Sequence, residues 1–325
     1  MRSLKRLGLS LLVLLAIAAV LPYLIPMPAR DLVPKKSPFV NGRFSDACGL
    51  RWHVQRWAAE TPASEAARGR IVLLHGFAGS TFSWRLTGPA LAAAGYEAMA
   101  IDMPPYGYTD RGTPDRPIAD CIVEIVRGEA GELPLTVIGH SMGASVAARV
   151  SQQLGERAEA LVLVDGGLGG RSRPSGVRAW MLQLPPVGRW AEVFAHHRML
   201  QPERFAQTLA SAYGREPSEA EIDGYRTPLL LAGTAPRVLG RAPSPGPLDL
   251  AALPRRQLIL WGREDAWVPP AWAERTAAEL PTAQLEWIEA AGHNPMETHP
   301  DIFMDRLLAF LQKPAAADSP PPATD

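Results

Sequence analysis

The chain has 325 residues, of which 47% are apolar and 20% are charged, and this composition is typical of a globular protein with a sizeable core. Its 33 basic and 33 acidic residues give a formal net charge of zero, so nothing favours nucleic acid as a partner. Two cysteines are too few for a disulfide framework or a four-cysteine zinc site. We therefore expect one large domain that carries no metal.

The N-terminal segment has the pattern of a membrane span or a signal peptide. Arg2, Lys5 and Arg6 precede residues 7–25, which hold no charged side chain. A helix of this length spans about 28 Å, close to the roughly 30 Å hydrocarbon core of a bilayer. We expect a single-pass anchor in a bacterial-type inner membrane, with the remaining chain on the periplasmic or extracytoplasmic side. Residues 26–30 make a poor cleavage site, but secretion after signal cleavage stays an alternative.

A linker and a globular domain follow the apolar segment. Residues 26–43 are rich in proline, which predicts a spacer. Alternation of apolar and polar residues from about Phe44, and through residues 50–57, predicts the first strands. The domain is expected over residues 44–312, and the Pro/Ala-rich tail 313–325 is expected to be disordered.

The next two buried strands each end in a loop that bears polar residues. The strand at residues 70–74 leads into His75, a glycine and Phe77, so the backbone N–H of Phe77 is expected at the carboxyl end of the sheet. His75 is expected to anchor this loop rather than act as a base. The strand at residues 96–101 ends at Asp102, which is expected to hold its own loop in place.

A helix opened by Asp115 and Pro117 comes next. Its apolar residues recur at spacings of three and four, which places Cys121 on the buried face. We expect Cys121 to act as a small hydrophobe rather than to pair with Cys48, although one bridge stays open in an oxidising compartment.

The most informative stretch is residues 135–150. A β-branched apolar run meets Gly-His-Ser-Met-Gly, and apolar residues then recur at helical spacing. This pattern predicts a strand, a very tight turn and a helix, with Ser141 at the tip of the turn. The flanking glycines are needed because larger side chains would collide where strand and helix pass. Ser141 is therefore the candidate nucleophile, and the N–H of Met142 is expected to pair with that of Phe77 as an oxyanion hole.

The pattern changes after the strand at residues 160–164 and Asp165. From about 168 to 250 the chain has amphipathic segments broken by prolines, which predicts an inserted helical cap. Its larger apolar residues are expected to form mainly the core of the cap. These residues are Trp180, Met181, Trp190, Phe194 and Phe205.

Strands resume at residues 257–261, followed by Asp265, and at residues 284–288, followed by His293. A run of buried strands alternating with helices predicts a mostly parallel, doubly wound α/β sheet, whose site lies at the carboxyl ends of the strands. Ser141 and these two residues each follow a strand end, in the order Ser, Asp, His.

A serine, a histidine and an aspartate can together turn a hydroxyl group into a nucleophile. A neutral serine hydroxyl is a poor nucleophile and needs a neutral imidazole to accept its proton. The imidazole needs a carboxylate that fixes its tautomer and stabilises the imidazolium. We assign these roles to Ser141, His293 and Asp265. Asp165 also follows a strand and is the competing carboxylate, with Glu264 as a third option.

Residues 44–312 resemble the α/β-hydrolase superfamily, in the branch of esterases, carbon–carbon bond hydrolases and cofactor-free haloperoxidase-like enzymes. The motifs that carry the resemblance lie at residues 75–77, 139–143, 262–265 and 292–293. The resemblance implies an eight-stranded sheet, a helical cap over the site and no cofactor.

Two positions depart from relatives in this superfamily. Many members have Asp-x-Pro-Gly-x-Gly after the fourth strand, whereas Pro105 takes the place of the first glycine, which implies a stiffer or displaced loop. Ser141 stands where haloalkane dehalogenases and epoxide hydrolases need an aspartate, which argues against their chemistry.

The sequence thus predicts a membrane-anchored serine hydrolase that cleaves a small-molecule acyl compound, most simply a carboxylic ester, through an acyl-enzyme. Carbon–carbon bond hydrolysis or perhydrolysis on the same three residues is the alternative enzyme activity. Acyl transfer to an acceptor other than water is a third. A non-catalytic member that binds a ligand or a partner is the alternative from another class.

Overall fold

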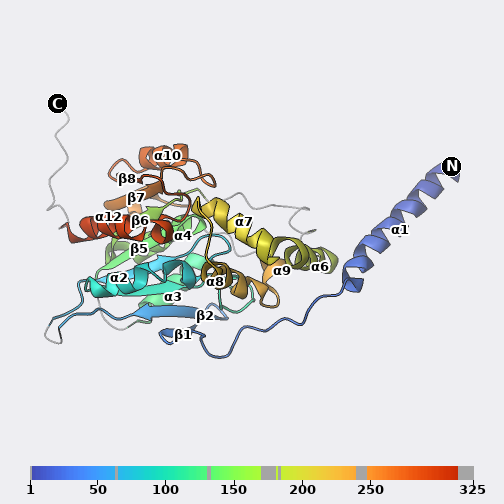
Figure 1. Cartoon of the computed structure of the whole chain (residues 1–325), viewed down its shortest axis with the longest axis horizontal. Coiled ribbons are helices and arrows are strands. Elements are labelled where there is room, and N and C mark those ends of the chain that lie inside the picture. The colour runs from blue at the N-terminus through green and yellow to red at the C-terminus, as the bar shows by residue number, and fades with distance from the viewer. Residues whose placement is uncertain are drawn as a thin grey trace.

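The computed structural model describes residues 2–62, 65–129, 133–169, 181, 184–238 and 247–313. In these ranges the chain folds around one eight-stranded sheet with the order β1-β2-β4-β3-β5-β6-β7-β8 (Figure 1). The pairs β1–β2 and β2–β4 are antiparallel and the other pairs are parallel, which confirms the predicted sheet. The strands are β1 (Gly42–Ala47), β2 (Leu50–Trp57), β3 (Arg70–Leu74), β4 (Glu97–Ile101), β5 (Leu135–His140), β6 (Ala158–Val164), β7 (Arg256–Gly262) and β8 (Gln284–Ile288).

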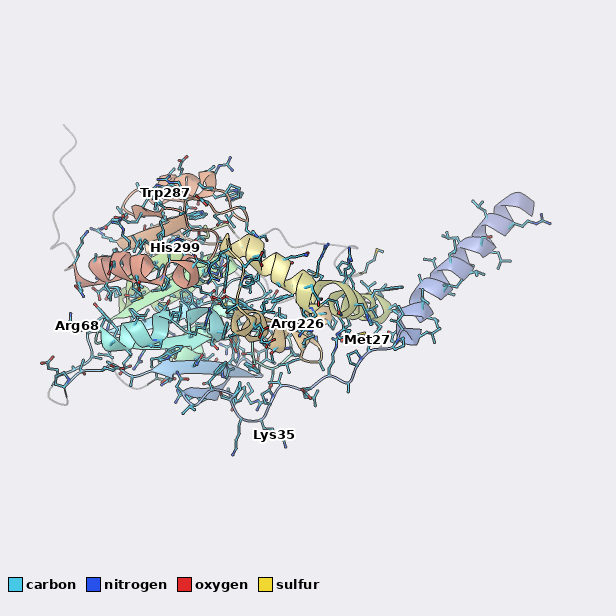
Figure 2. The ribbon with its side chains drawn as sticks, in the orientation of Figure 1. Met27, Lys35, Arg68, Arg226, Trp287 and His299 are labelled. Atoms are coloured by element: carbon cyan, nitrogen blue, oxygen red, sulfur yellow. A yellow bond between two sulfur atoms is a disulfide. The ribbon has the colours of Figure 1, made fainter. Side chains whose placement is uncertain are left out.

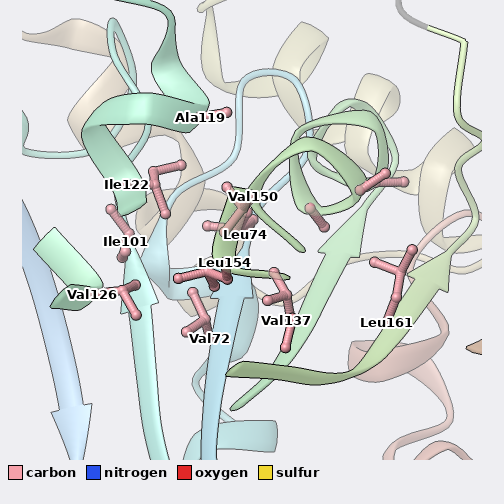
Figure 3. Close-up of a cluster of buried hydrophobic side chains, with 14 of the residues drawn as sticks. Val72, Leu74, Ile101, Ala119, Ile122, Val126, Val137, Val150, Leu154 and Leu161 are labelled. Carbon is pink, nitrogen blue, oxygen red and sulfur yellow. The ribbon is translucent and has the colours of Figure 1, made fainter. Parts of the chain in front are cut away.

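Helices cover both faces of this sheet. They are α2 (Thr87–Ala93), α3 (Ile118–Arg127), α4 (Met142–Leu154), α10 (Ala271–Glu279), α11 (Pro295–Thr298) and α12 (Pro300–Gln312), with the short turns η1 (Thr81–Trp84), η2 (Gly155–Arg157) and η4 (Leu250–Ala252). Successive strand residues point to opposite faces, so each central strand supplies two cores. Val72 and Leu74 pack under α3 and α4 (Figure 3), whereas Ile71 and Leu73 pack under α2 and α12.

Between β6 and β7 the described residues form a helical cap: α6 (Pro185–Phe194), the π-helical turn η3 (Ala195–Met199), α7 (Pro202–Tyr213), α8 (Glu219–Leu230) and α9 (Thr234–Val238). Phe205 packs inside the cap, as predicted. The prediction is wrong for Met181, Trp190 and Phe194, whose exposed fractions are 50%, 36% and 57%. Trp180 lies outside the described residues, as does the tail from residue 314.

The N-terminal helix α1 (Arg2–Leu24) projects from the body (Figure 1). Its segment Arg6–Leu24 is long and apolar enough to span a membrane or to act as a signal sequence. The chain leaves α1 at the end where α6 and α9 lie, near Met27 (Figure 2). Residues 26–41 then run to β1 without helix or strand.

The two cysteines form a disulfide, contrary to the expectation for Cys121. Cys121 does lie on the buried face of α3, but this face also covers the turn between β1 and β2 that holds Cys48. The two Cα atoms lie 5.6 Å apart although 73 residues separate them along the chain. The helical pattern indicated that Cys121 is buried, but it could not indicate which distant turn lies beneath the helix.

Candidate active site

Ser141 occupies a strained turn between β5 and α4. Its backbone has φ 51° and ψ −118°, a left-handed conformation that is rare for a residue with a side chain. A Cβ on Gly139 would lie 2.2 Å from the carbonyl oxygen of Gly143, and a Cβ on Gly143 would lie 2.4 Å from that of Leu74. Only glycine fits at both positions, so strand and helix approach closely and Ser141 stands at the carboxyl edge of the sheet.

The structure brings Ser141, His293 and Asp265 into one hydrogen-bonded chain. His293 Nδ1 lies 2.7 Å from Asp265 Oδ2, and His293 Nε2 lies 3.0 Å from Ser141 Oγ. A carboxylate can only accept, so Nδ1 carries the proton and Nε2 is left to accept from the serine hydroxyl. The backbone N–H groups of Trp267 and Val268 donate to Asp265 Oδ1 at 2.7 and 2.9 Å, which fixes the carboxylate.

Asp165, the competing carboxylate, lies behind Asp265 rather than against the imidazole nitrogen. Its Oδ1 accepts a hydrogen bond from the N–H of Gly262 at 2.8 Å. Burial, and then the charge of Asp265, raise the pKa of Asp165 well above its usual range, which favours the neutral acid form of this carboxyl. Glu264 is exposed at the surface. Ligand atoms of Asp165, Asp265 and His293 lie within 4.8 Å of one another, but the contact between His293 and Asp265 is a hydrogen bond, which fits a proton relay better than a cation site.

The loop after β3 runs beside Ser141. A Cβ on Gly76 would lie 3.1 Å from the Cβ of Ser141, so this backbone passes at van der Waals distance from the nucleophile turn. His75 anchors the loop: its Nε2 accepts from the N–H of Met103 at 2.8 Å. Burial lowers the pKa of His75, which keeps the ring neutral for this bond. Phe77, the next residue, packs its ring edge-on against Tyr106.

Asp102 holds its own loop, as the sequence indicated. Its buried carboxylate accepts from the N–H groups of Thr81 and Tyr108 and from Nδ1 of His53 at 2.8 Å. The loop that contains Pro105 is therefore tied to β2 and to η1 through Asp102.

Two residues around His293 were missed by sequence reasoning. Trp267 stacks on the imidazole, with ring centroids 5.5 Å apart and an interplanar angle of 22°, and so covers one face of the His293 ring. His140 Nε2 donates to the carbonyl oxygen of His293 at 2.8 Å. Burial, and then the nearby His293, hold the pKa of His140 well below its usual range. Their closeness in sequence to Asp265 and Ser141 was the only available signal.

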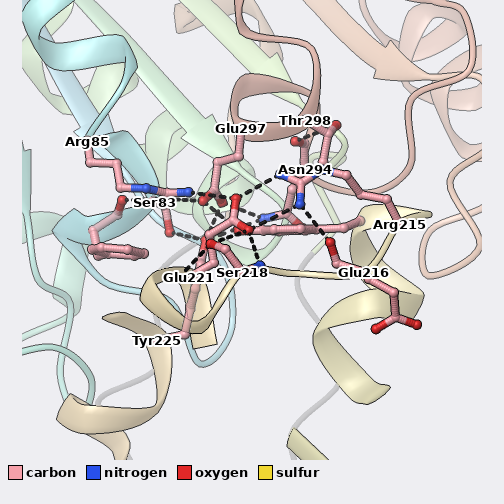
Figure 4. A network of polar contacts seen from close by, with 12 residues as sticks. Ser83, Arg85, Arg215, Glu216, Ser218, Glu221, Tyr225, Asn294, Glu297 and Thr298 are labelled. Atoms are coloured by element: carbon pink, nitrogen blue, oxygen red, sulfur yellow. Dashed lines mark hydrogen bonds and ion pairs between the residues drawn. The ribbon is translucent and has the colours of Figure 1, made fainter. Parts of the chain in front are cut away.

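A buried polar network joins the cap to the body next to His293 (Figure 4). At its centre is Glu297, whose carboxylate accepts from Arg85 and Asn294 of the body and from Tyr213 and Tyr225 of the cap. Its side chain is fully buried, so the Arg85 guanidinium is required to balance its charge. The network fixes the end of α7 and the middle of α8 close to His293.

Apolar side chains of the cap lie over the nucleophile turn. Leu200, Phe205 and Leu229 pack with Tyr106 of the body and against Met142, the residue after Ser141. Apolar side chains of the cap therefore pack against the residue that follows Ser141.

A parallel α/β sheet with a serine, a histidine and an aspartate hydrogen-bonded at its carboxyl edge defines a class of hydrolases. Residues 71–306 match the model of the alpha/beta hydrolase family, and the chain belongs to this family. The resemblance found in the sequence is thereby confirmed.

One relative and two solved structures of the same fold are similar to this chain. The 2-hydroxy-6-oxononadienedioate/2-hydroxy-6-oxononatrienedioate hydrolase of Burkholderia vietnamiensis is 26% identical over 262 residues, which cover 75% of this chain and 87% of that protein. The crystal structure of a membrane phospholipase A, a bacterial virulence factor, aligns with a TM-score of 0.63 at 19% identity, covering 94% of this chain and 98% of that one. A thermophilic esterase from Thermogutta terrifontis aligns with a TM-score of 0.59 at 19% identity, covering 88% and 98%.

Proposed function

We propose that the protein is a serine hydrolase that cleaves carboxylic esters through an acyl-enzyme. The observation that carries the proposal is the hydrogen-bonded chain from Ser141 Oγ through His293 to Asp265, which starts at a strained turn on the sheet edge. Binding alone does not require these three side chains in this order, so the geometry favours an enzyme over a non-catalytic member.

The steps follow from the arrangement. His293 Nε2 accepts the hydroxyl proton while Ser141 Oγ attacks the carbonyl carbon, and Asp265 stabilises the imidazolium that forms. The backbone N–H groups of Phe77 and Met142 hold the oxyanion. His293 returns the proton to the leaving alcohol, which departs and leaves an acyl-serine. Water, deprotonated by His293, then attacks the acyl carbon, and the proton passes back to Ser141 Oγ as the acid leaves.

The apolar side chains of the cap fit an ester of an apolar acid. Leu200, Phe205 and Leu229 offer a hydrocarbon surface beside Met142, which suits an apolar acyl chain. Hydrolysis of a carbon–carbon bond remains the second candidate, because a relative named for that substrate class is 26% identical over most of its length. The same three residues would serve both reactions.

The proposed location is outside the cytoplasm, with α1 as a retained anchor. The apolar segment Arg6–Leu24 supports a membrane span. The Cys48–Cys121 disulfide supports an oxidising compartment, because such bonds persist mainly in secreted and periplasmic proteins.

A substrate panel tests the reaction class. Purified full-length protein should hydrolyse aryl esters of aliphatic acids, and Ser141→Ala should abolish this activity. Vinylogous diketones are the comparison substrates for carbon–carbon cleavage. Faster turnover of the diketones would transfer the assignment to the second candidate, and turnover of neither class would refute both.

A further inference from the structure

Side chains of the cap donate hydrogen bonds to backbone carbonyls of α1 that lack a donor within the helix. In an α-helix the carbonyl of Ala18 accepts from the N–H four residues on, but that residue is Pro22, which has none. The indole N–H of Trp190, on α6, donates to this carbonyl at 2.8 Å. The carbonyl of Pro22 meets the same problem at Pro26, and Arg189 Nε donates to it at 3.1 Å. Two neighbouring cap residues therefore replace two missing backbone donors.

Further contacts fix α6 against the end of the anchor. The Arg189 guanidinium lies over the ring of Tyr23, with 6.0 Å from Cζ to the ring centroid. Arg30, beyond the helix, forms an ion pair with Glu192 of α6. His197 donates to the carbonyl oxygen of Pro26 at 3.0 Å. These contacts make the position of α6 along α1 specific.

The position of α6 along α1 sets how deep the cap lies in a bilayer that α1 spans. Ala18 precedes Leu24, the last residue of α1, by six residues, which corresponds to about 9 Å along the helix axis. If Arg6–Leu24 spans the bilayer, the indole of Trp190 lies about 9 Å inside the end of the span. Helices that lie in the plane of a membrane bury their apolar face to a similar depth of about 5–10 Å.

The exposed side chains of this segment suit a lipid interface. Trp190 and Phe194 are one helical turn apart, so they share a face of α6, and both are exposed in the absence of lipid, as is Met199 just beyond. The neighbouring Arg198 is also exposed and can reach lipid phosphates. Tryptophan beside basic side chains is typical of the membrane–water boundary.

We propose that α6 and η3 form an in-plane membrane-binding segment, held at its depth by α1, and that the substrates are lipid acyl esters that reside in the bilayer. The partner is the lipid surface itself. η3 ends directly before Leu200, which packs over Tyr106 beside the nucleophile turn, so an acyl chain leaving the bilayer at this segment is close to Ser141. The substrate half of this inference rests on the proposed ester hydrolysis, whereas the docking half does not.

The docking half is tested on the full-length protein in nanodiscs that hold one copy each. A fluorescent label at Phe194→Cys is compared with the same label at Ile302→Cys, an exposed position on α12, since the native cysteines are bridged. We expect bromine-labelled lipid to quench the label at 194 severalfold more than that at 302, and iodide in the water to do the reverse. Equal quenching at both positions would overturn docking. Shielding from iodide without quenching by lipid would also overturn it, because protein rather than lipid would then cover the segment.

The substrate half is tested by activity. Trp190→Ser combined with Phe194→Ser should lower kcat/KM on long-chain esters in vesicles by on the order of tenfold, and should leave hydrolysis of a short, water-soluble ester unchanged. Trp272→Ser combined with Ile302→Ser, an equally exposed pair outside the cap, is the matched control. An equal loss on both substrates, or no loss, would refute the substrate half. Absence of Ser141-dependent turnover on either ester would refute the proposed function and leave the label experiment to decide docking.

Discussion

The backbone N–H of His293 donates a hydrogen bond of 2.7 Å to the carbonyl oxygen of Ala212 in the last turn of α7. The last carbonyls of a helix have no partner within the helix, so the loop that carries His293 supplies a backbone donor to the end of α7. The position of His293 is thus coupled to the position of the cap. The Glu297 network lies next to this bond and reinforces it.

Glu297→Ala should destabilise the protein by about 3 kcal/mol, because the Arg85 guanidinium then keeps only Glu221 as a counter-charge and several donors lose their acceptor. Tyr225→Phe is the matched control, since it removes one partner of Glu297 and keeps the charge pair, at a cost of about 1 kcal/mol. Chemical unfolding of both variants measures the difference. Equal losses of stability in the two variants would mean that the Arg85–Glu297 ion pair stabilises the protein no more than a single hydrogen bond does.

An aspartate-to-asparagine substitution should change activity little at Asp165 and greatly at the neighbouring Asp265. Asp165→Asn puts a neutral amide of the same shape in place of a carboxyl whose raised pKa favours the neutral acid, and should leave kcat within about threefold of wild type. Asp265→Asn removes the carboxylate that fixes the His293 tautomer and should lower kcat by roughly four orders of magnitude. A severe loss in Asp165→Asn would show that Asp165 takes part as a carboxylate.

Asp165 also affects the pH dependence of stability. Its pKa is raised in the folded state, so the folded protein keeps a proton that the unfolded chain releases above about pH 4. The wild type should therefore lose stability as pH rises through this region toward the raised pKa. Asp165→Asn should lack this contribution and should gain stability relative to wild type as pH rises from about 4 toward the raised pKa. Parallel stability curves would contradict the assignment.

His140 should make the protein less stable as pH falls, whereas Asp165 should make it less stable as pH rises. Its pKa is lowered in the folded state, so below about pH 6.5 the unfolded chain binds a proton that the folded protein does not. The free energy of unfolding should therefore fall as pH drops below about 6.5 toward the lowered pKa of this residue. His140→Gln keeps a donor for the His293 carbonyl and should reduce the fall. An unchanged slope of stability against pH would refute the prediction.

The disulfide should stabilise the fold strongly, because it closes a loop of 73 residues between Cys48 and Cys121. Restriction of the unfolded chain by a loop of that length is worth roughly 4 kcal/mol. Cys48→Ser combined with Cys121→Ser should lower the free energy of unfolding by about that amount, with activity at low temperature retained. A reducing agent should have the same effect on the wild type and none on the double variant.

The sequence predicted most of the site because the signals are local. Glycines around Ser141 reveal the turn, and Asp265 and His293 stand directly after recognisable strands. The disulfide and the exposure of Trp190 could not be predicted, since both depend on which distant segment lies against a helix. Pro22 indicates a missing donor in α1, but only the folded chain identifies Trp190 as the group that replaces it. The sequence already favoured Asp265 over Asp165, but only the folded chain shows that Asp265 Oδ2 lies 2.7 Å from His293 Nδ1.

The central claim, an activated serine at residue 141, is tested most directly by labelling with a fluorophosphonate and reading the intact mass. We expect one adduct on the wild-type protein, none on Ser141→Ala, and strong loss in His293→Ala. A well-folded wild type that accepts neither this probe nor a smaller electrophile would contradict the claim. An adduct that persists in Ser141→Ala would contradict it as well, because the reactive group would then lie elsewhere.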